Sequence, residues 1–275
     1  MKVAIVGIGC VGSAILKDFT EKSINVVAYD KFKNGGIGRL EDTLLCDILF
    51  LCLPTMYSEK LKEYNKTSLI EVCTELSIYK YKGLVVIKST IEPETTQKCS
   101  ETFNLNFAHN PEFLSANTAY EDFKNQDHIV LGHPYNTDES ILQPLIDFYS
   151  TYYPNAKQSI LHSTESELMK ISVNNFYSVK IQFFNEIYLL SENLGISYDK
   201  VKDTMLKNNW INEMHTNVPG TDGKLSYGGM CFPKDTNALN EYMIRKKVPN
   251  RVLQSTITER NMLRNDHINC EKQTI

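Results

Sequence analysis

Long apolar runs, paired cysteines and an excess of basic residues are all missing from this 275-residue sequence. No window holds the roughly 18 consecutive apolar residues of a membrane-spanning helix. The seven cysteines form no CxxC pair and follow no secretory signal, which is typical of a cytosolic chain with reduced thiols. Lys and Arg number 29 against 33 Asp and Glu, a net charge of -4 that argues against non-specific nucleic-acid binding. We therefore expect a soluble, cytoplasmic protein with no nucleic-acid or membrane partner and no bound metal.

The composition is that of a globular chain, with 42% hydrophobic and 23% charged residues. Its first part alternates short apolar runs with helical spacing, and continuous apolar strands between helices are typical of a parallel sheet covered on both faces. The expected fold class is α/β, a doubly wound Rossmann-like sheet followed by an all-helical part with a long central helix. The predicted strands are 3–6, 25–30, 47–53, 84–88, 106–109 and 128–132; the predicted helices are 11–22, 58–79, 165–193, 197–210, 236–247 and 250–265, with a long loop at 212–235.

A glycine-rich turn follows the first predicted strand. Residues 7–12 read GIGCVG, a GxGxxG pattern, and Asp30 ends the next strand 18 residues after Gly12. Gly7 allows a tight turn, Gly9 lets a pyrophosphate approach the backbone, and Gly12 permits close packing of helix on strand. The helix N-terminus supplies N–H donors to phosphates, while Asp30 accepts from a ribose diol and repels a 2′-phosphate, which favours NAD over NADP.

The alternative is a glycine-rich turn that binds nothing. The NAD-binding residues predicted in this region are Gly7, Gly9, Cys10, Val11, Gly12, Asp30 and Lys31.

A second informative segment, at residues 227–236, reads YGGMCFPKDT. Its glycines let a substrate approach the Cys231 thiol closely. Lys234 favours the thiolate, which is the nucleophilic form, and Asp235 can orient a water or shuttle a proton. The alternative is a buried thiol at a turn, which is the usual fate of a lone cysteine.

This segment resembles the signature of the UDP-glucose/GDP-mannose dehydrogenase family. Further blocks match the family in the same order: VIKST at 86–90, NPEFL at 110–114, TAYEDF at 118–123, Lys170-x-x-x-Asn174, and FNE at 184–186. With the N-terminal pattern, the matches span residues 3 to about 261. The expected domains are residues 1–160, which bind NAD, and residues 161–275, a helical central and dimerisation domain that carries Lys170, Asn174 and Cys231.

The resemblance implies an enzyme that oxidises the primary alcohol of a nucleotide sugar to a carboxylate with two NAD. UDP-glucose is the expected substrate, with GDP-mannose or a UDP-N-acetyl sugar as alternatives. Cys231 would capture the aldehyde as a thiohemiacetal, and the second oxidation would leave a thioester that water hydrolyses. A uronate product of this kind serves polysaccharide synthesis.

The resemblance also implies roles for single residues. Lys170 and Asn174, four residues apart on one helix face, match the lysine that stabilises the oxyanion and the asparagine that positions substrate and water. Without the resemblance they read as an exposed polar helix face. Asp235 matches an aspartate tied to proton transfer, Thr90 a hydroxyl near the nicotinamide, and Glu112 a glutamate of the substrate loop.

Three sets of site residues follow. The catalytic set is Cys231, Lys170, Asn174, Asp235, Thr90 and Glu112. The cofactor set adds Pro54, Thr55, Ser89, Thr90 and Lys234 to the residues of the glycine-rich region. The substrate set is Glu112, Phe113, Leu114, Lys170, Asn174, Tyr227, Gly228 and Cys231.

The sequence departs from the family pattern in two places. Four residues after Glu112 the family carries a second glutamate, implicated in hydrolysis of the thioester, where this sequence has Ala116. Alanine cannot act as a base, so two alternatives are open: Asp235, with a water held by Thr90 and Asn174, substitutes, or hydrolysis of the thioester is slow. The chain also stops soon after the helical region, whereas family members continue into a domain that caps the site.

Three hypotheses stay open. The first is an active NAD-dependent nucleotide-sugar dehydrogenase, with a homodimer formed through the helix at 165–193. The second is a truncated homologue that binds nucleotide or a full-length partner without turnover, motivated by Ala116 and the missing cap. The third is another oxidoreductase of the broader 6-phosphogluconate dehydrogenase-like class, acting on a small hydroxy acid, which leaves Cys231 without a task.

Overall fold

The computed structural model describes residues 1–266, so Cys270 lies outside the described residues. The chain forms two compact units. The first contains Met1–Thr55 and Asn65–Lys170, and the second contains Met56–Tyr64 and the chain from Ile171 onward. Within residues 1–266, none of the helices combines the length and apolar character needed to cross a bilayer.

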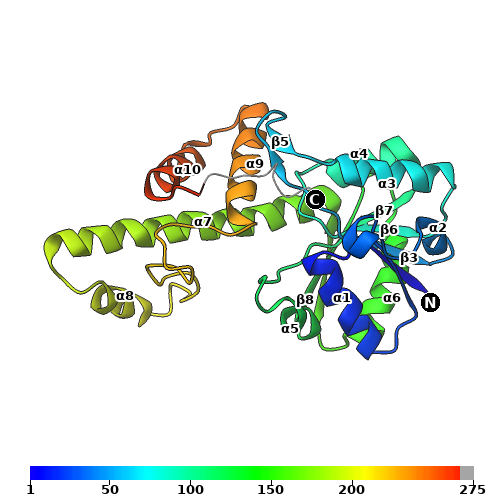
Figure 1. Ribbon diagram of the computed structural model, residues 1–275, viewed down its shortest axis with the longest axis horizontal. Coiled ribbons are helices and arrows are strands. Elements are labelled where there is room, and N and C mark those ends of the chain that lie inside the picture. Colours follow the sequence, from blue (N-terminus) through cyan, green and yellow to red (C-terminus); the bar gives the residue numbers. More distant parts are fainter. Residues whose placement is uncertain (267–275) are drawn as a thin grey trace. The chain divides into compact units, whose positions relative to one another are not determined.

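The first unit is built on a seven-stranded sheet in the order β2-β1-β3-β6-β7-β8-β9, which confirms the expected Rossmann-like α/β class (Figure 1). The strands from β2 to β7 are parallel, β8 runs antiparallel to β7, and β9 is parallel to β8. Strand order reverses at β1 and β3, the place where open α/β sheets bind ligands. The strands are β1 (Val3–Val6), β2 (Val26–Tyr29), β3 (Ile48–Leu51), β6 (Leu84–Ile87), β7 (Asn106–His109), β8 (His128–His133) and β9 (Lys157–His162).

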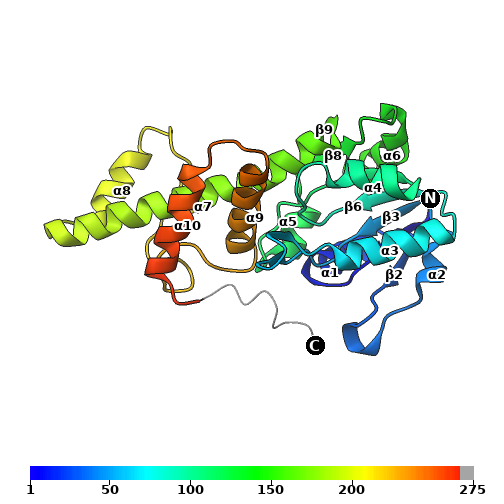
Figure 2. The same cartoon turned by 90° about the horizontal axis from the view of Figure 1, so that it is seen from above.

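Helices cover both faces of this sheet (Figures 1 and 2). On one face, Phe19, Phe50 and Phe148 meet in an aromatic cluster between helices and strands. The helices there are α1 (Cys10–Glu21), α5 (Ala119–Lys124) and α6 (Gln143–Tyr152), and those of the other face are α2 (Leu40–Thr43), α3 (Thr67–Ile78) and α4 (Thr95–Phe103). Short 3₁₀ turns lie at Lys33–Gly35 and Glu139–Leu142. Burial on both faces explains why the strands are continuously apolar.

The second unit is helical and carries one small hairpin. Its core joins Tyr57 and Tyr64 of the hairpin to Ile171, Leu239 and Leu253 of three helices. The elements are β4 (Tyr57–Ser58), β5 (Glu63–Tyr64), α7 (Ser163–Leu194, which begins in the first unit), α8 (Tyr198–Leu206), α9 (Phe232–Arg245) and α10 (Arg251–Leu263).

The expected helix at 58–79 is wrong over its first nine residues, because α3 begins only at Thr67. Residues 57–64 form the β4–β5 hairpin instead, with Lys62 in the turn at a φ of 59°. Tyr57 and Tyr64 bury their rings in the core of the second unit. These long-range contacts override the local helical spacing.

The expected start of the helix at 236 is also wrong, and the error falls on the candidate site. Helix α9 begins at Phe232, with Pro233 in its first turn, where proline is favoured. Cys231 is therefore the N-cap residue of α9.

At the start of α7, the Glu165 carboxylate accepts a hydrogen bond from the His162 N–H at 2.8 Å, so Glu165 caps the helix. Glu167 is completely buried and accepts from the Thr96 N–H of α4 at 2.7 Å.

Candidate active site

Close backbone contacts shape the glycine-rich turn after β1. Gly7 has a φ of +91°, and a Cβ there would lie 2.5 Å from the Cys52 carbonyl oxygen. A Cβ on Gly12 would lie 1.9 Å from the Gly7 carbonyl oxygen, so α1 packs directly on the turn. A Cβ on Gly9, the N-cap of α1, meets nothing within 4 Å. Because the first N–H groups of a helix lack intrahelical partners, this open side fits the diphosphate of a dinucleotide.

Asp30 follows β2 and binds the same turn. Its carboxylate accepts hydrogen bonds from the N–H groups of Ile8 at 2.7 Å, Lys33 at 2.8 Å and Phe32 at 2.9 Å. Burial opposes ionisation, but these N–H donors outweigh it and hold the pKa of Asp30 below its ordinary value. Asp30 is therefore a carboxylate at neutral pH, as an acceptor for a ribose diol must be.

Two lysines follow Asp30, and they take different positions. The Lys33 ammonium donates to the Ile8 carbonyl at 2.5 Å and to the Ser13 hydroxyl at 2.9 Å, so it ties this loop to the glycine-rich turn. Lys31, the lysine selected from the sequence, is exposed and lies 3.9 Å from a carboxylate oxygen of Glu71. Lys33 was missed because its spacing from Asp30 belongs to no motif.

The carboxyl ends of β3 and β6 are joined by hydroxyl groups. Thr55 donates to the Thr90 carbonyl at 2.7 Å, and Ser89 donates to the Leu53 carbonyl at 2.6 Å. These bonds hold the turns that contain Pro54, Thr55, Ser89 and Thr90 at the same sheet edge as the glycine-rich turn, because the strands are parallel. The cofactor residues predicted in the first unit thus share one edge.

A buried lysine anchors the predicted substrate loop. Lys88, at the end of β6, donates to both the carbonyl and the side-chain oxygen of Asn110, at 3.0 and 2.8 Å. Asn110 in turn donates to the Val130 carbonyl at 2.9 Å and accepts from the Tyr149 hydroxyl at 2.5 Å. Burial lowers the pKa of Lys88 to about 8. The first residue of the NPEFL block is thereby fixed from three sides.

Glu112 and Lys170 meet at the end of this loop. The Glu112 carboxylate accepts from the Leu114 N–H at 2.6 Å, and its other oxygen lies 3.9 Å from the Lys170 ammonium. The ammonium also lies 5.0 Å from the centroid of the half-exposed Phe113 ring. The four predicted residues therefore cluster, with Lys170 itself buried.

Asp235 is the centre of the polar cluster in the second unit. It is completely buried, and its carboxylate accepts from Asn174 at 2.6 Å, from Lys234 at 2.5 Å and from the Tyr64 hydroxyl at 2.5 Å. The Asn175 side chain donates to the Asp235 carbonyl at 3.1 Å. The structure brings Asn174 and Asp235 together, and Lys234 is their neighbour.

Tyr64 is a site residue that the sequence did not reveal. It stands 171 residues from Asp235, in a segment expected to be helical, and no motif contains it. Only the hairpin brings its hydroxyl to the carboxylate.

Cys231 presents its thiol at the N-terminus of α9. The residue is exposed, while Tyr227 is buried and Gly229 takes a φ of +76°, which favours glycine. A Cβ on Gly228 would lie 2.4 Å from the guanidinium of Arg264, so that glycine is packed tightly. In residues 1–266 no cluster of three or more His, Cys, Asp or Glu side chains is arranged to hold a metal ion.

Two family models match this chain. The NAD binding domain of the UDP-glucose/GDP-mannose dehydrogenase family matches residues 40–153, and the central domain of the same family matches residues 164–261. The chain therefore belongs to the UDP-glucose/GDP-mannose dehydrogenase family. NAD is the cofactor of its first unit, and the open side at Gly9 and the ionised Asp30 fit that ligand.

Two bacterial relatives agree with this assignment. The chain is 32% identical over 222 residues to a UDP-glucose 6-dehydrogenase of Rickettsia prowazekii, covering 77% of this chain and 48% of that protein. It is 28% identical to one of Campylobacter jejuni, covering 98% of this chain and 74% of that protein. It thus spans about half the length of the Rickettsia relative.

Solved structures share the fold. A UDP-glucose dehydrogenase from Pyrobaculum islandicum superposes with a TM-score of 0.82 at 24% identity, over 95% of this chain and 68% of that chain. A 3-hydroxyisobutyrate dehydrogenase from Mycobacterium tuberculosis gives 0.77 at 17% identity, over 97% of this chain and 94% of that chain. The fold therefore serves dehydrogenases of more than one kind.

Proposed function

We propose that this chain is an NAD-dependent nucleotide-sugar 6-dehydrogenase that converts UDP-glucose to UDP-glucuronate. The observation that carries the proposal is the exposed Cys231 thiol at the N-cap of α9, whose first turn holds Asp235 bonded to Asn174. An enzyme that stops at an aldehyde or ketone needs no such thiol, and one that makes an acid through a thioester does. The UDP-glucose 6-dehydrogenase relatives support the choice of substrate.

In the proposed mechanism, the glycine-rich turn and Asp30 would hold NAD, which would supply the hydride acceptor for each of two oxidations. The Cys231 thiolate adds to the aldehyde carbon, and the resulting thiohemiacetal holds the substrate covalently until its oxidation leaves a thioester. The Lys170 ammonium stabilises negative charge on the substrate oxygen, and Thr90 lies beside the reacting carbon. The helix N-terminus at Cys231 favours negative charge through its N–H groups.

Hydrolysis of the thioester consumes a water, and Ala116 cannot serve as the base that activates it. Other side chains must therefore position that water. Asn174 donates one amide hydrogen to Asp235 and keeps its carbonyl oxygen for a water. Asp235 accepts hydrogen bonds from three side chains, which holds its carboxylate in one orientation. We propose that this pair positions the water in the absence of a second glutamate.

The test is the NADH yield on nucleotide sugars. UDP-glucose in limiting amount should give two NADH per molecule, and Cys231→Ser should abolish acid formation. Cys46→Ala, which removes a buried thiol before β3, is the matched control and should behave as the unmodified protein. An unaffected rate in Cys231→Ser contradicts the covalent step. NAD binding without reduction by UDP-glucose, GDP-mannose or UDP-N-acetyl sugars would favour the non-catalytic homologue.

We also propose that the chain forms a homodimer through α7. Phe176, Phe183 and Leu190 are 64%, 47% and 53% exposed and stand seven residues apart, so they share one helix face. Light scattering after size-exclusion chromatography should give twice the chain mass, and Phe183→Ser should shift the species toward the monomer. A monomer in the unmodified protein would refute this.

The remaining proposals concern the domain boundaries and the cellular location of the protein. We propose residues 1–160 and 161–275 as the two domains, a division that falls between the two family segments. The compact units of the fold differ from it, because the first extends to Lys170 and residues 56–64 belong to the second. We place the enzyme in the cytoplasm, where a uronate product supplies polysaccharide synthesis. Cell fractionation with a tagged chain tests the location, and detection in a membrane or secreted fraction would contradict it.

A further inference from the structure

The loop that leads to Cys231 contains a strained residue. Ser226 has a φ of 57°, in the left-handed region that a side chain other than glycine rarely adopts. Its N–H donates to the Asn185 side chain at 2.8 Å, and its hydroxyl donates to Gln182 at 2.6 Å, both on α7. Such a conformation is unfavourable for serine and persists only where the surroundings enforce it.

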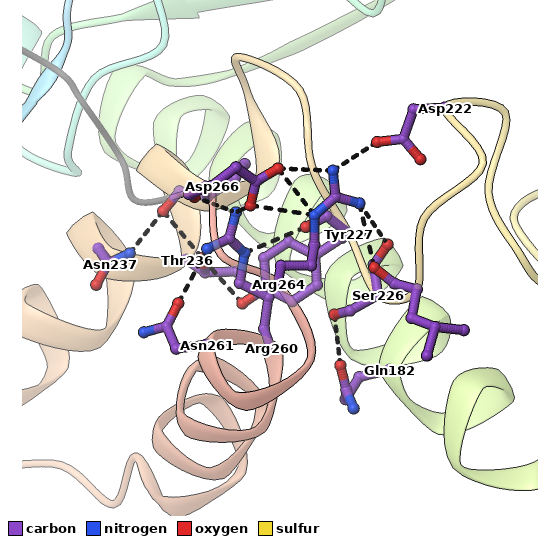
Figure 3. Close-up of polar contacts among 12 residues, drawn as sticks. Gln182, Asp222, Ser226, Tyr227, Thr236, Asn237, Arg260, Asn261, Arg264 and Asp266 are labelled. Atoms are coloured by element: carbon purple, nitrogen blue, oxygen red, sulfur yellow. Dashed lines mark hydrogen bonds and ion pairs between the residues drawn. The ribbon is translucent and has the colours of Figure 1, made fainter. Parts of the chain in front are cut away.

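Two buried arginines supply further constraint on the loop (Figure 3). Arg264 donates to the carbonyls of Leu225 and Ser226, each at 3.2 Å. Arg260 donates to the next carbonyl, that of Tyr227, also at 3.2 Å. Three successive carbonyls are thus bound by two arginines, Arg260 and Arg264, which are only 3% and 5% exposed.

Two aspartates hold the arginines in position. Arg264 donates to Asp222 at 2.5 Å and to Asp266 at 2.7 and 2.9 Å, and Arg260 donates to Asp266 at 2.6 Å. The hydrogen bond from Arg264 is the main cause that lowers the pKa of each aspartate, so both stay ionised near neutral pH. Figure 3 shows Asp222 and Asp266 on either side of the Arg264 guanidinium.

We propose that Arg264, with Arg260, positions the Cys231 loop for the covalent step. In this role the two residues act through the backbone of Leu225–Tyr227. This inference rests on the proposed function of Cys231. We call Arg260 and Arg264 the arginine clamp.

The geometry explains how the clamp reaches the thiol. Only three residues separate Tyr227 from Cys231, and the Arg264 guanidinium also fills the space where a Cβ of Gly228 would stand. A shift of the Tyr227 carbonyl therefore passes to the N-cap of α9. Displacement of a reacting group by about 1 Å can cost on the order of 100-fold in rate. The planar fork of arginine suits two neighbouring acceptors, whereas lysine offers a point charge.

The experiment compares Arg264→Met and Arg264→Lys with Arg251→Met, which removes an exposed arginine at the first residue of α10. For each protein we would measure kcat and KM with UDP-glucose, the Kd of NAD, the thermal midpoint, and the rate of tryptic cleavage after Lys224. We expect Arg264→Met to lower kcat by roughly 100-fold. The Kd of NAD should change little, because all predicted cofactor residues except Lys234 lie in the first unit, and cleavage after Lys224 should be faster. Arg264→Lys should recover part of kcat, and Arg251→Met should match the unmodified protein.

A kcat and a cleavage rate in Arg264→Met equal to those of Arg251→Met would overturn the proposal. The proposal would also be overturned if Arg264→Met lowered the NAD affinity and the thermal midpoint in parallel, because that result indicates a general structural role. If the unmodified protein oxidises no nucleotide sugar, the proposed function fails separately. The role of the arginine clamp is then tested by the rate of tryptic cleavage after Lys224 and by the rate at which iodoacetamide alkylates Cys231. Both rates should change in Arg264→Met and stay unchanged in Arg251→Met.

Discussion

Glu167 makes the stability of the first unit depend on pH. The residue lies in the first turns of α7, is completely buried, and binds the N–H of Thr96 through one oxygen. Its other carboxylate oxygen has no hydrogen-bond partner among the described residues. Burial is the main cause that raises the pKa of Glu167 from 4.5 to about 7. The folded chain therefore binds this proton more tightly than the unfolded chain does.

The sign and size of the effect follow from linkage. The favourable contribution is complete below pH 4.5, falls as the pH rises, and is lost above about 7. The interval between 4.5 and 7 corresponds to about 3 kcal/mol of unfolding free energy. Glu167→Gln carries no titrating proton, so its stability should lack this decline.

The assay is urea unfolding followed by far-ultraviolet circular dichroism at pH 5, 6, 7 and 8. The difference in unfolding free energy between Glu167→Gln and the unmodified protein should move in favour of the variant by about 3 kcal/mol from pH 5 to 8. Glu165→Gln, an exposed change two residues away on the same helix, should leave the pH dependence as it is. Parallel curves for Glu167→Gln and the unmodified protein would refute the reasoning.

Two further changes test the site. Gly9→Ala should keep the unfolding midpoint, because its Cβ has open space, and should weaken NAD binding in a calorimetric titration. Gly12→Ala should lower the unfolding midpoint, because its Cβ would meet the Gly7 carbonyl oxygen at 1.9 Å. Equal midpoints for the two variants would contradict the contact geometry. Tyr64→Phe removes a hydroxyl from Asp235 and should cost about 1 kcal/mol of stability in urea unfolding and lower kcat more than it changes the Kd of NAD. An unchanged kcat in Tyr64→Phe would separate the hairpin from the chemistry.

Much of the first unit could be predicted from the sequence. The GIGCVG turn and Asp30 depend on short spacings, and each glycine meets a backbone constraint within its own βαβ unit. The apolar runs of six strands likewise stand out, because both faces of the sheet are buried. The strand β9 and the helices α4, α5 and α6 were not predicted, because their local patterns are weak or mixed with polar residues.

By itself, then, the sequence determined the class of fold, and it located the GIGCVG turn that we propose for NAD and the segment around Cys231 that we propose to be reactive, since these are contiguous patterns. Tertiary structure alone decided that residues 57–64 form a hairpin of the second unit and bring Tyr64 to Asp235. It likewise decided that Arg260 and Arg264 bind the loop before Cys231. The physical reason is that a buried donor needs an acceptor close to it in space, whatever the position of that acceptor in the sequence. The carbonyl bound by Arg260 lies 33 residues away along the chain, and the carboxylate bound by Tyr64 lies 171 residues away.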